Sequence, residues 1–219
     1  MSQDFFELLS SVWATFPKLD QRLEPWHHVA DVTAYAKQPP LSLLDGFDKR
    51  GFDKRGFDKR GFDKRGEAFV HCTAIIEDDV HLRSFAVISA GCFVASGAYL
   101  RGGVLLGPNT HVGPNVELKS VICAGDSAIA HLSYVGNTVI GRGVNIEAGA
   151  VVANHLNEAV GTTIKVVHNG HLIDTGLLKF GALIGDDVKI GANSVLSPGT
   201  VLTKGTIVPR LTLVKQHIY

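Results

Sequence analysis

Aliphatic residues recur at every sixth position over much of the chain, and this period constrains the fold more than any other feature. From position 76 the sixth residues are Ile76, Leu82, Ile88, Val94, Leu100, Leu106, Val112, Leu118 and Ala124, and the phase returns at 140, 146 and 152 and from 184 to 208. An α-helix with 3.6 residues per turn cannot keep such a stripe aligned. A parallel β-helix can, because each hexad forms one short strand and one corner.

Three hexads close a triangular coil of 18 residues, and successive coils stack at the strand spacing of about 4.8 Å. The aliphatic residues then fill the inside of the prism. We therefore predict an all-β fold, a parallel β-helix over residues 67–219. Two five-residue steps, from Ala130 to Val135 and from Val135 to Ile140, interrupt the period, and we expect a loop insert at about 153–180.

Residues 1–45 follow a helical pattern instead. Phe5, Leu8, Leu9, Val12 and Phe16 form an apolar stripe that Pro17 ends. A second helix is expected from Pro25, which suits a first turn, to a point before Pro39-Pro40. We predict a small N-terminal helical appendage that packs on the prism or on a neighbouring subunit.

Four copies of the pentapeptide GFDKR run from Gly46 to Arg65. Neither a helix nor a strand would gather the four phenylalanines on one side, and a glycine at every fifth position weakens both structures. We therefore predict a loop or linker over 46–66. The alternative is a basic arm that contacts nucleic acid, although the four aspartates dilute its positive charge.

The charge balance argues against nucleic-acid and membrane partners. Lys+Arg and Asp+Glu both number 21, but the repeat holds 8 cations and 4 anions, which leaves 13 cations against 17 anions elsewhere, a net charge of −4. No apolar run approaches the roughly 20 residues of a membrane span. The three cysteines lack a CxxC spacing and are expected to be buried free thiols, so we expect a cytoplasmic protein.

Arg83, Arg101 and Lys119 are spaced by one 18-residue coil, and each directly follows a core aliphatic. They are therefore predicted to form a basic column on one face. Like charges about 4.8 Å apart repel, at a cost of about 1 kcal/mol per exposed pair, and a bound anion would remove that cost. Alternatively, the side chains splay into water or pair with acids such as Glu117.

The region where the period slips carries AHLSYVGN and VNIEAGAVVANH. Its His131 is a candidate general base near neutral pH, because imidazole titrates there. The alternative is a solvated histidine with no catalytic role. None of the ten histidines shows the H-x4-H spacing associated with zinc carbonic anhydrases of the β-helix type, so no metal is expected.

Five stretches between about residues 98 and 208 are shared, in order, with one protein family. They are AYLRGG, VELKS, AHLSYVGN, VNIEAGAVVANH and KFGALIGDD. They resemble the C-terminal acetyltransferase domain of the bifunctional N-acetylglucosamine-1-phosphate uridyltransferase (GlmU) family, a group of hexapeptide-repeat, left-handed β-helix acyltransferases. The resemblance implies a left-handed coil, a homotrimer with sites between neighbouring prisms, and acetyl-CoA as a co-substrate.

The resemblance also implies roles for individual residues. His131 matches the catalytic base, and Arg101 and Lys119 match groups that hold the sugar phosphate, with Arg83 extending their column. Tyr134, Asn145 and Lys179 match positions that contact the amino sugar, sometimes across a subunit boundary. Two alanines, Ala148 and Ala192, together with Asn154 and His155, fall at coenzyme positions; His155 replaces a tyrosine and Ala192 a serine. The segment 156–178 replaces a short connection.

Two functions follow from these features. The first is transfer of an acetyl or other acyl group from a coenzyme A thioester to the amine of an amino sugar or amino-sugar phosphate. The alternative is a non-catalytic trimeric β-helix that binds a sugar phosphate as a sensing or assembly module.

Overall fold

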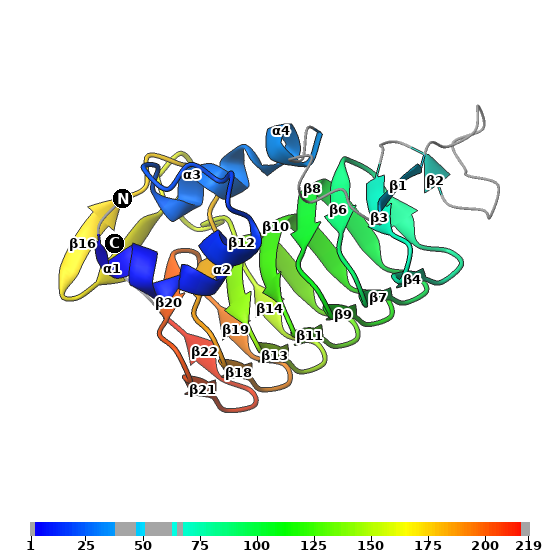
Figure 1. Ribbon diagram of the computed structural model, residues 1–219. Helices are drawn as coiled ribbons and strands as arrows, with labels where there is room; N and C mark the ends of the chain where they lie inside the picture. The colour runs from blue at the N-terminus through cyan, green and yellow to red at the C-terminus, as the bar shows by residue number, and fades with distance from the viewer. Residues whose placement is uncertain (1–2, 38–46, 51–62, 65–67, 216–219) are drawn as a thin grey trace.

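The computed structural model describes residues 3–37, 47–50, 63–64 and 68–215. Within them the chain is a left-handed parallel β-helix with four short helices along one side (Figure 1). The predicted fold, a β-helix with a small N-terminal helical appendage, is therefore confirmed. The prism has three faces, which we name the Arg101 face, the helix-covered face and the Asn145 face.

The Arg101 face and the helix-covered face belong to one sheet, because three long strands bend around the corner between them. These strands are β8 (Tyr99–Leu106), β10 (Glu117–Gly125) and β12 (Tyr134–Arg142). The Arg101 face also contains β2 (Asp63–Lys64), β5 (His81–Leu82), β14 (Val151–Val152), β19 (Val195–Leu196) and β22 (Leu213–Val214). The helix-covered face also contains β1 (Phe47–Arg50), β3 (Ala68–His71), β6 (Ala86–Ile88), β17 (Ala182–Ile184) and β20 (Thr200–Leu202).

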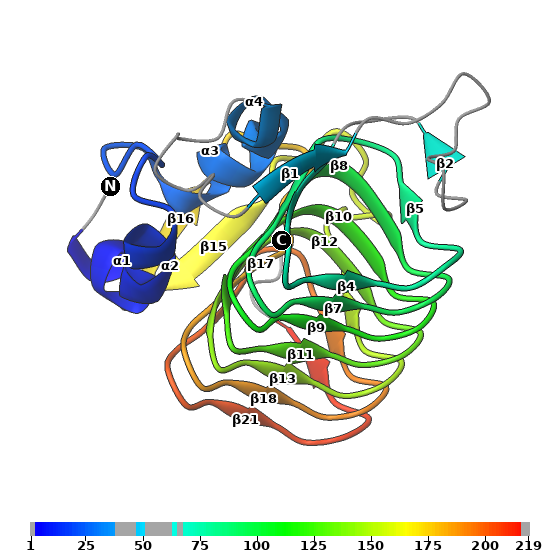
Figure 2. The ribbon, with the colours of Figure 1, turned by 45° about the vertical axis from the view of Figure 1, so that its right-hand side comes forward.

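The Asn145 face is a separate parallel sheet of two-residue strands. Figure 2 shows them stacked in order, with the helices on a different side of the prism. The strands are β4 (Ile75–Ile76), β7 (Phe93–Val94), β9 (His111–Val112), β11 (Ala128–Ile129), β13 (Asn145–Ile146), β18 (Lys189–Ile190) and β21 (Ile207–Val208).

Aliphatic side chains one coil apart stack inside the prism, as the six-residue period predicted. Leu82 pairs with Leu100 and Leu100 with Leu118, and the three are at most 1% exposed. The period fails earlier than the sequence predicted, however. Cys123 and Ile129, not the neighbouring alanines 124 and 130, lie in the interior stacks, so the five-residue steps are 118–123 and 135–140.

The corner between the two joined faces explains these short steps. Strand β8 turns it with two left-handed residues, Gly102 (φ 69°) and Gly103 (φ 85°), whereas β10 and β12 turn it with one each, Ser120 and Asn137. One residue fewer shortens the step from six to five and shifts the register of β8 against β10. Gly103 also permits close approach of a helix, because a Cβ there would lie 2.6 Å from the backbone nitrogen of Thr33.

Each predicted N-terminal helix is split into two short helices, at Leu9 and at Asp31. The helices pack on an outward-facing aliphatic column of the prism that includes Leu105, Ile122 and Leu183. This apolar face is buried in the protein because the helices cover it. The helices are α1 (Gln3–Leu8), α2 (Ser10–Thr15), α3 (Pro25–Ala30) and α4 (Val32–Lys37).

The insert at 156–178 contains an antiparallel hairpin, β15 (Lys165–His168) and β16 (His171–Asp174). The hairpin packs beside the helices: the rings of Phe5 and His168 are stacked with centroids 4.5 Å apart. Just after the insert, Phe180 contacts Trp26 with centroids 6.1 Å apart. The insert and the N-terminal helices therefore form one continuous cluster on the helix-covered face.

Most of the GFDKR repeat lies outside the described residues, so the predicted linker over 46–66 and the segment limits at 1–45 and 67–219 stay predictions. The described part of the first copy, β1, pairs antiparallel with β3. One prediction about cysteine is wrong: Cys72 is exposed, whereas Cys92 and Cys123 are buried. Burial raises the pKa of the Cys92 thiol to about 12.

Candidate functional site

The basic column predicted from the 18-residue spacing lies on the Arg101 face. Arg101 stands directly beside Lys119 in the parallel register, and Arg83 follows the same ladder one coil earlier. The predicted alternative also holds in part, because the Arg101 guanidinium donates from Nε to Glu117 Oε1 at 2.7 Å and forms an ion pair with it. The Arg83 guanidinium lies over the Tyr99 ring, 5.7 Å from its centroid.

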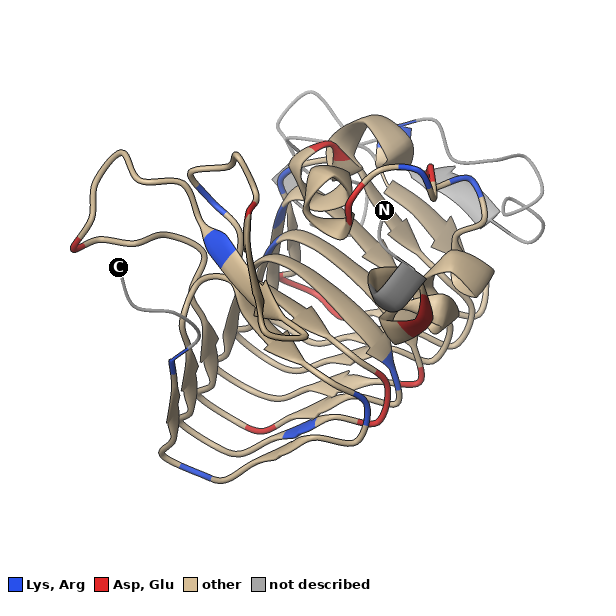
Figure 3. Cartoon of the chain, turned by 90° about the vertical axis from the view of Figure 1, so that its left-hand side faces the viewer, with Lys and Arg blue, Asp and Glu red and all other residues tan. Residues whose placement is uncertain are grey.

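Lys119 is the cation of this column whose charge is least well compensated. Burial, Lys179 and Arg101 lower the pKa of Lys119 below its ordinary value, and Glu117 opposes them only in part. Lys179 reaches this column from the end of the insert. Lys179 and Arg101 therefore both repel the Lys119 ammonium, and a bound anion would relieve this repulsion. Elsewhere basic and acidic segments alternate along the coils (Figure 3).

Tyr134 and Asn154 lie next to this column, over a glycine. Gly136 pairs with Lys119 in the register, and a Cβ at Gly136 would lie 2.5 Å from the Tyr134 phenol oxygen and 2.7 Å from Asn154 Nδ2. The buried Asn154 amide donates to Asn137 Oδ1 at 2.6 Å. Burial and the nearby Glu117 carboxylate raise the pKa of Tyr134, so its phenol is a neutral hydrogen-bonding group near pH 7.

His131 lies at the corner between the Asn145 face and the Arg101 face. The hydrogen bonds between coils stack Pro114, His131, Ala148 and Ala192 as consecutive residues of one corner column. His131 is exposed, and its imidazole forms no hydrogen bond or ion pair within the described part of the chain. The predicted base, His131, and two predicted coenzyme positions, Ala148 and Ala192, are thus neighbours in one column. In sequence, 17 residues separate His131 from Ala148 and 44 separate Ala148 from Ala192.

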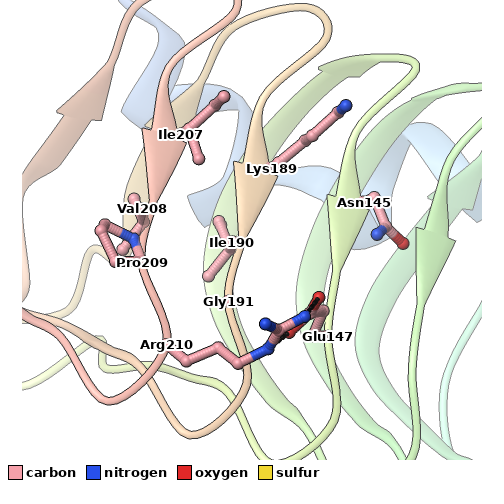
Figure 4. A pocket seen from close by; sticks show the side chains of 9 residues that line it. All are labelled: Asn145, Glu147, Lys189, Ile190, Gly191, Ile207, Val208, Pro209 and Arg210. Atoms are coloured by element: carbon pink, nitrogen blue, oxygen red, sulfur yellow. Dashed lines mark hydrogen bonds and ion pairs between the residues drawn. The ribbon is translucent and has the colours of Figure 1, made fainter.

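Asn145 points outward from a different face and borders a groove of about 180 Å³ on the C-terminal coils (Figure 4). Lys189 stands beside it in the register, and Ile207 follows on the next strand. At the other side of the groove Arg210 forms a two-point ion pair with Glu147, with nitrogen–oxygen distances of 2.7 and 2.6 Å. Glu147 Oε2 also accepts the backbone N–H of Ala192 at 2.9 Å.

The structure brings the predicted residues together in two groups and leaves others apart. Arg101, Lys119, Tyr134, Asn154 and Lys179 gather on the Arg101 face, and His131, Ala148 and Ala192 stack at the adjoining corner. Asn145 lies on another face, and His155 is exposed at the start of the insert.

Sequence reasoning missed Asn137, Lys189 and the Glu147–Arg210 pair. Asn137 ends the quoted stretch AHLSYVGN and carried a usable signal, because a polar residue beside glycine often takes a left-handed turn. The other three gave none: the insert makes one coil 44 residues long, from Val151 to Val195, so coil arithmetic could not bring them together.

Two features of the described residues bear on the site. No group of three or more His, Cys, Asp or Glu side chains is placed to hold a metal ion. None of the helices in the described ranges has the length and apolar character needed to cross a membrane.

Comparison with known proteins finds relatives over part of the chain. A bifunctional sugar-1-phosphate nucleotidylyltransferase/acetyltransferase of Sulfurisphaera tokodaii is 40% identical over 84 residues, which are 38% of this chain and 20% of that protein. The bifunctional protein GlmU of Cellvibrio japonicus is 29% identical over 126 residues, 55% of this chain and 24% of that protein. GlmU of Buchnera aphidicola subsp. Schizaphis graminum is 40% identical over 81 residues, 37% of this chain and 13% of that protein.

No protein-family model matches the chain. The chain spans less than a quarter of the length of these three curated relatives. The resemblance inferred from the five shared stretches is nevertheless confirmed by these matches, and the β-helix is the fold that the resemblance implied. Over part of its length the chain is therefore a homologue of bifunctional GlmU proteins, and this part folds as a hexapeptide-repeat β-helix.

Proposed function

We propose that this protein transfers an acyl group from a coenzyme A thioester to the amine of an amino sugar or amino-sugar phosphate. The observation that carries the proposal is the register. It sets His131 at a corner next to the face on which Arg101 and Lys119 are neighbours and Lys179 acts on the Lys119 ammonium. A relative whose name includes an acetyltransferase matches this chain over part of its length, which supports the reaction class.

In this proposal the Arg101 face binds the sugar phosphate. A phosphate between Lys119 and Lys179 would relieve the repulsion between these cations. Tyr134 would contact a sugar hydroxyl, because it is a half-buried hydrogen-bonding group at the edge of the column, and Asn154 would lie near the thioester of the donor, as predicted from the resemblance. Binding would hold the sugar amine near the corner of the prism.

The chemistry is a direct transfer. His131 accepts a proton as the amine nitrogen attacks the thioester carbonyl, and a C–N bond forms. The tetrahedral intermediate collapses, the C–S bond breaks, and the proton passes from the imidazolium to the departing sulfur. Backbone N–H groups stabilise the oxyanion, and orientation of the two substrates supplies much of the rate.

A second copy of the chain is needed to complete the site. Asn145 belongs to β13 and Arg101 to β8, and these strands lie on different faces of the triangular prism (Figure 2). Outward-pointing side chains on two different faces diverge, so one copy would not hold a small ligand between them. A neighbouring prism that places its Asn145 face against the Arg101 face would bring them together. We therefore propose a homotrimer with three equivalent sites between neighbouring prisms.

A thiol-release assay tests the reaction class. The protein is incubated with acetyl-CoA and a panel of amino sugars that includes glucosamine 1-phosphate, and free thiol is measured over time. Turnover with an amino sugar supports the transferase. Tight binding of sugar phosphate without turnover from any thioester donor would support the alternative, a non-catalytic sugar-phosphate module.

The depressed pKa of Lys119 predicts how sugar-phosphate binding depends on pH. Lys119 loses its proton more easily than an ordinary lysine does, and a bound phosphate favours the protonated form. Affinity for the phosphate is therefore highest below the pKa that Lys119 has in the unliganded protein, and it falls as pH rises through that pKa. Above that pKa, affinity falls by up to about tenfold per pH unit. We expect Lys119→Arg to remove this fall, because arginine stays charged.

Calorimetric titration with glucosamine 1-phosphate between about pH 7.5 and 10 measures the effect, since the phosphate itself is fully ionised in that range. Equal pH dependence in the wild-type protein and Lys119→Arg would show that Lys119 does not contact the anion.

A further inference from the structure

The groove on the Asn145 face contains the Glu147 carboxylate, which accepts hydrogen bonds from two donor groups. Glu147 accepts both the Arg210 guanidinium and the backbone N–H of Ala192 (Figure 4). The three residues belong to successive coils, and the Arg210 side chain reaches back across the intervening coil to the Glu147 carboxylate (Figure 4). Arg210 and the bound N–H hold the Glu147 pKa below its ordinary value, so the pair is ionised near pH 7.

These two donors have the chemistry of an anion site. A guanidinium binds phosphate with two parallel hydrogen bonds, and an unpaired backbone N–H binds a phosphate or amide carbonyl oxygen. Lys189 adds a second cation on the same groove, and Ile207 and Pro209 supply an apolar side. A ligand with a phosphate and an apolar arm would fit this combination, but the Glu147 carboxylate stands where the phosphate would bind.

The position of the pair relates it to the reaction. Ala192, whose N–H is occupied, directly follows Ala148 in the corner column that contains His131. Under the proposed function, on which this inference rests, the acyl donor lies along that column. The phosphates of such a donor would therefore lie near the Glu147 carboxylate, which repels them, and near Arg210, which is already paired with Glu147.

We propose that Glu147 is a specificity-determining residue that competes with phosphate-bearing acyl donors for Arg210 and for the Ala192 N–H. Removing its charge frees Arg210 for the donor phosphate and removes a repulsion. In the wild-type protein this competition lowers the affinity for coenzyme A thioesters, which remain the donors of the proposed function, and leaves the affinity for donors without phosphates unaffected. An internal ion pair across the coils would in this way tune donor binding.

The test compares Glu147→Gln with Asp187→Asn, which removes the same charge from a different surface ion pair, that with Lys204. Binding of coenzyme A is measured by calorimetry on the full chain. Glu147→Gln is expected to tighten it by about three- to tenfold. Asp187→Asn should leave it unchanged. In the double variant Glu147→Gln/Arg210→Ala the gain should disappear, because it comes from the freed arginine.

Turnover separates this inference from the proposed function. Transfer from acetyl-CoA and from the S-acetyl thioester of N-acetylcysteamine, which lacks phosphates, is measured for each variant. Glu147→Gln should raise kcat/KM for acetyl-CoA alone. Equal gains with both donors, unchanged or weaker coenzyme A binding, or no coenzyme A binding by any variant would overturn the inference. Tighter coenzyme A binding without transfer from either donor would support it and contradict the proposed function.

Discussion

Replacing His131 with alanine is expected to lower kcat for acyl transfer by about 10²–10⁴, the range for loss of a general base. The imidazole is exposed and forms no hydrogen bond or ion pair within the described residues, so its removal should leave the free energy of unfolding within about 0.5 kcal/mol of the wild-type value. Affinity for glucosamine 1-phosphate should change little, because the proposed phosphate site is on the adjoining face.

The matched control is His171→Ala, which removes another exposed histidine from the hairpin of the insert. Its kcat should equal that of the wild-type protein. A His131→Ala protein that folds, binds sugar phosphate and retains its kcat would show that the imidazole does not accept the proton.

Replacing Trp26 with alanine is expected to lower the free energy of unfolding by about 3–5 kcal/mol, the cost of truncating a buried aromatic residue. Trp26 is 2% exposed and contacts Phe5 in α1 and Phe180 after the insert. Its removal therefore opens a cavity where the helices, the insert and the prism meet. The aliphatic column beneath them would then be less well shielded from water.

Phe6→Ala is the matched control, because Phe6 is adjacent to Phe5 but 39% exposed, and we expect a change of less than about 1 kcal/mol. Thermal unfolding followed by circular dichroism and by tryptophan fluorescence measures both variants. Separate transitions for the two probes would show that helices and coils unfold independently. Equal midpoints for Trp26→Ala and Phe6→Ala would contradict a structural role for the helical cluster.

Most of the fold could be predicted from the sequence, because an inward aliphatic at every sixth residue is a direct consequence of the coil geometry. The period failed where the corner changed. Ser120 and Asn137 each turn the corner as a single left-handed residue, whereas Gly102 and Gly103 turn it as a pair. The residue types alone do not tell whether a corner uses one left-handed residue or two. The breaks at Leu9 and Asp31, which split each expected helix in two, were likewise not predicted from the apolar pattern.

The site was less predictable than the fold, for a reason that lies in the insert. Before residue 153 the sequence distance between stacked residues is 17 or 18, so the column of Arg101 and Lys119 could be inferred. Beyond residue 153, the sequence distance between stacked residues depends on how many residues the insert adds outside the prism. Glu147 and Arg210 are 63 residues apart and pair only because the insert folds outside the coil. That Asn145 and Arg101 lie on different faces also became clear only from the three-dimensional arrangement.

The central claim is that one acyl-transfer site combines His131 of one copy with Asn145 of another. Co-expression of His131→Ala chains with Asn145→Ala chains tests it directly, with thiol release as the readout. Each variant alone should be nearly inactive, while random mixing should restore about a quarter of the wild-type kcat, because half the sites receive an intact His131 and half of those meet an intact Asn145. Mixed assemblies no more active than the two variants assayed separately would contradict it.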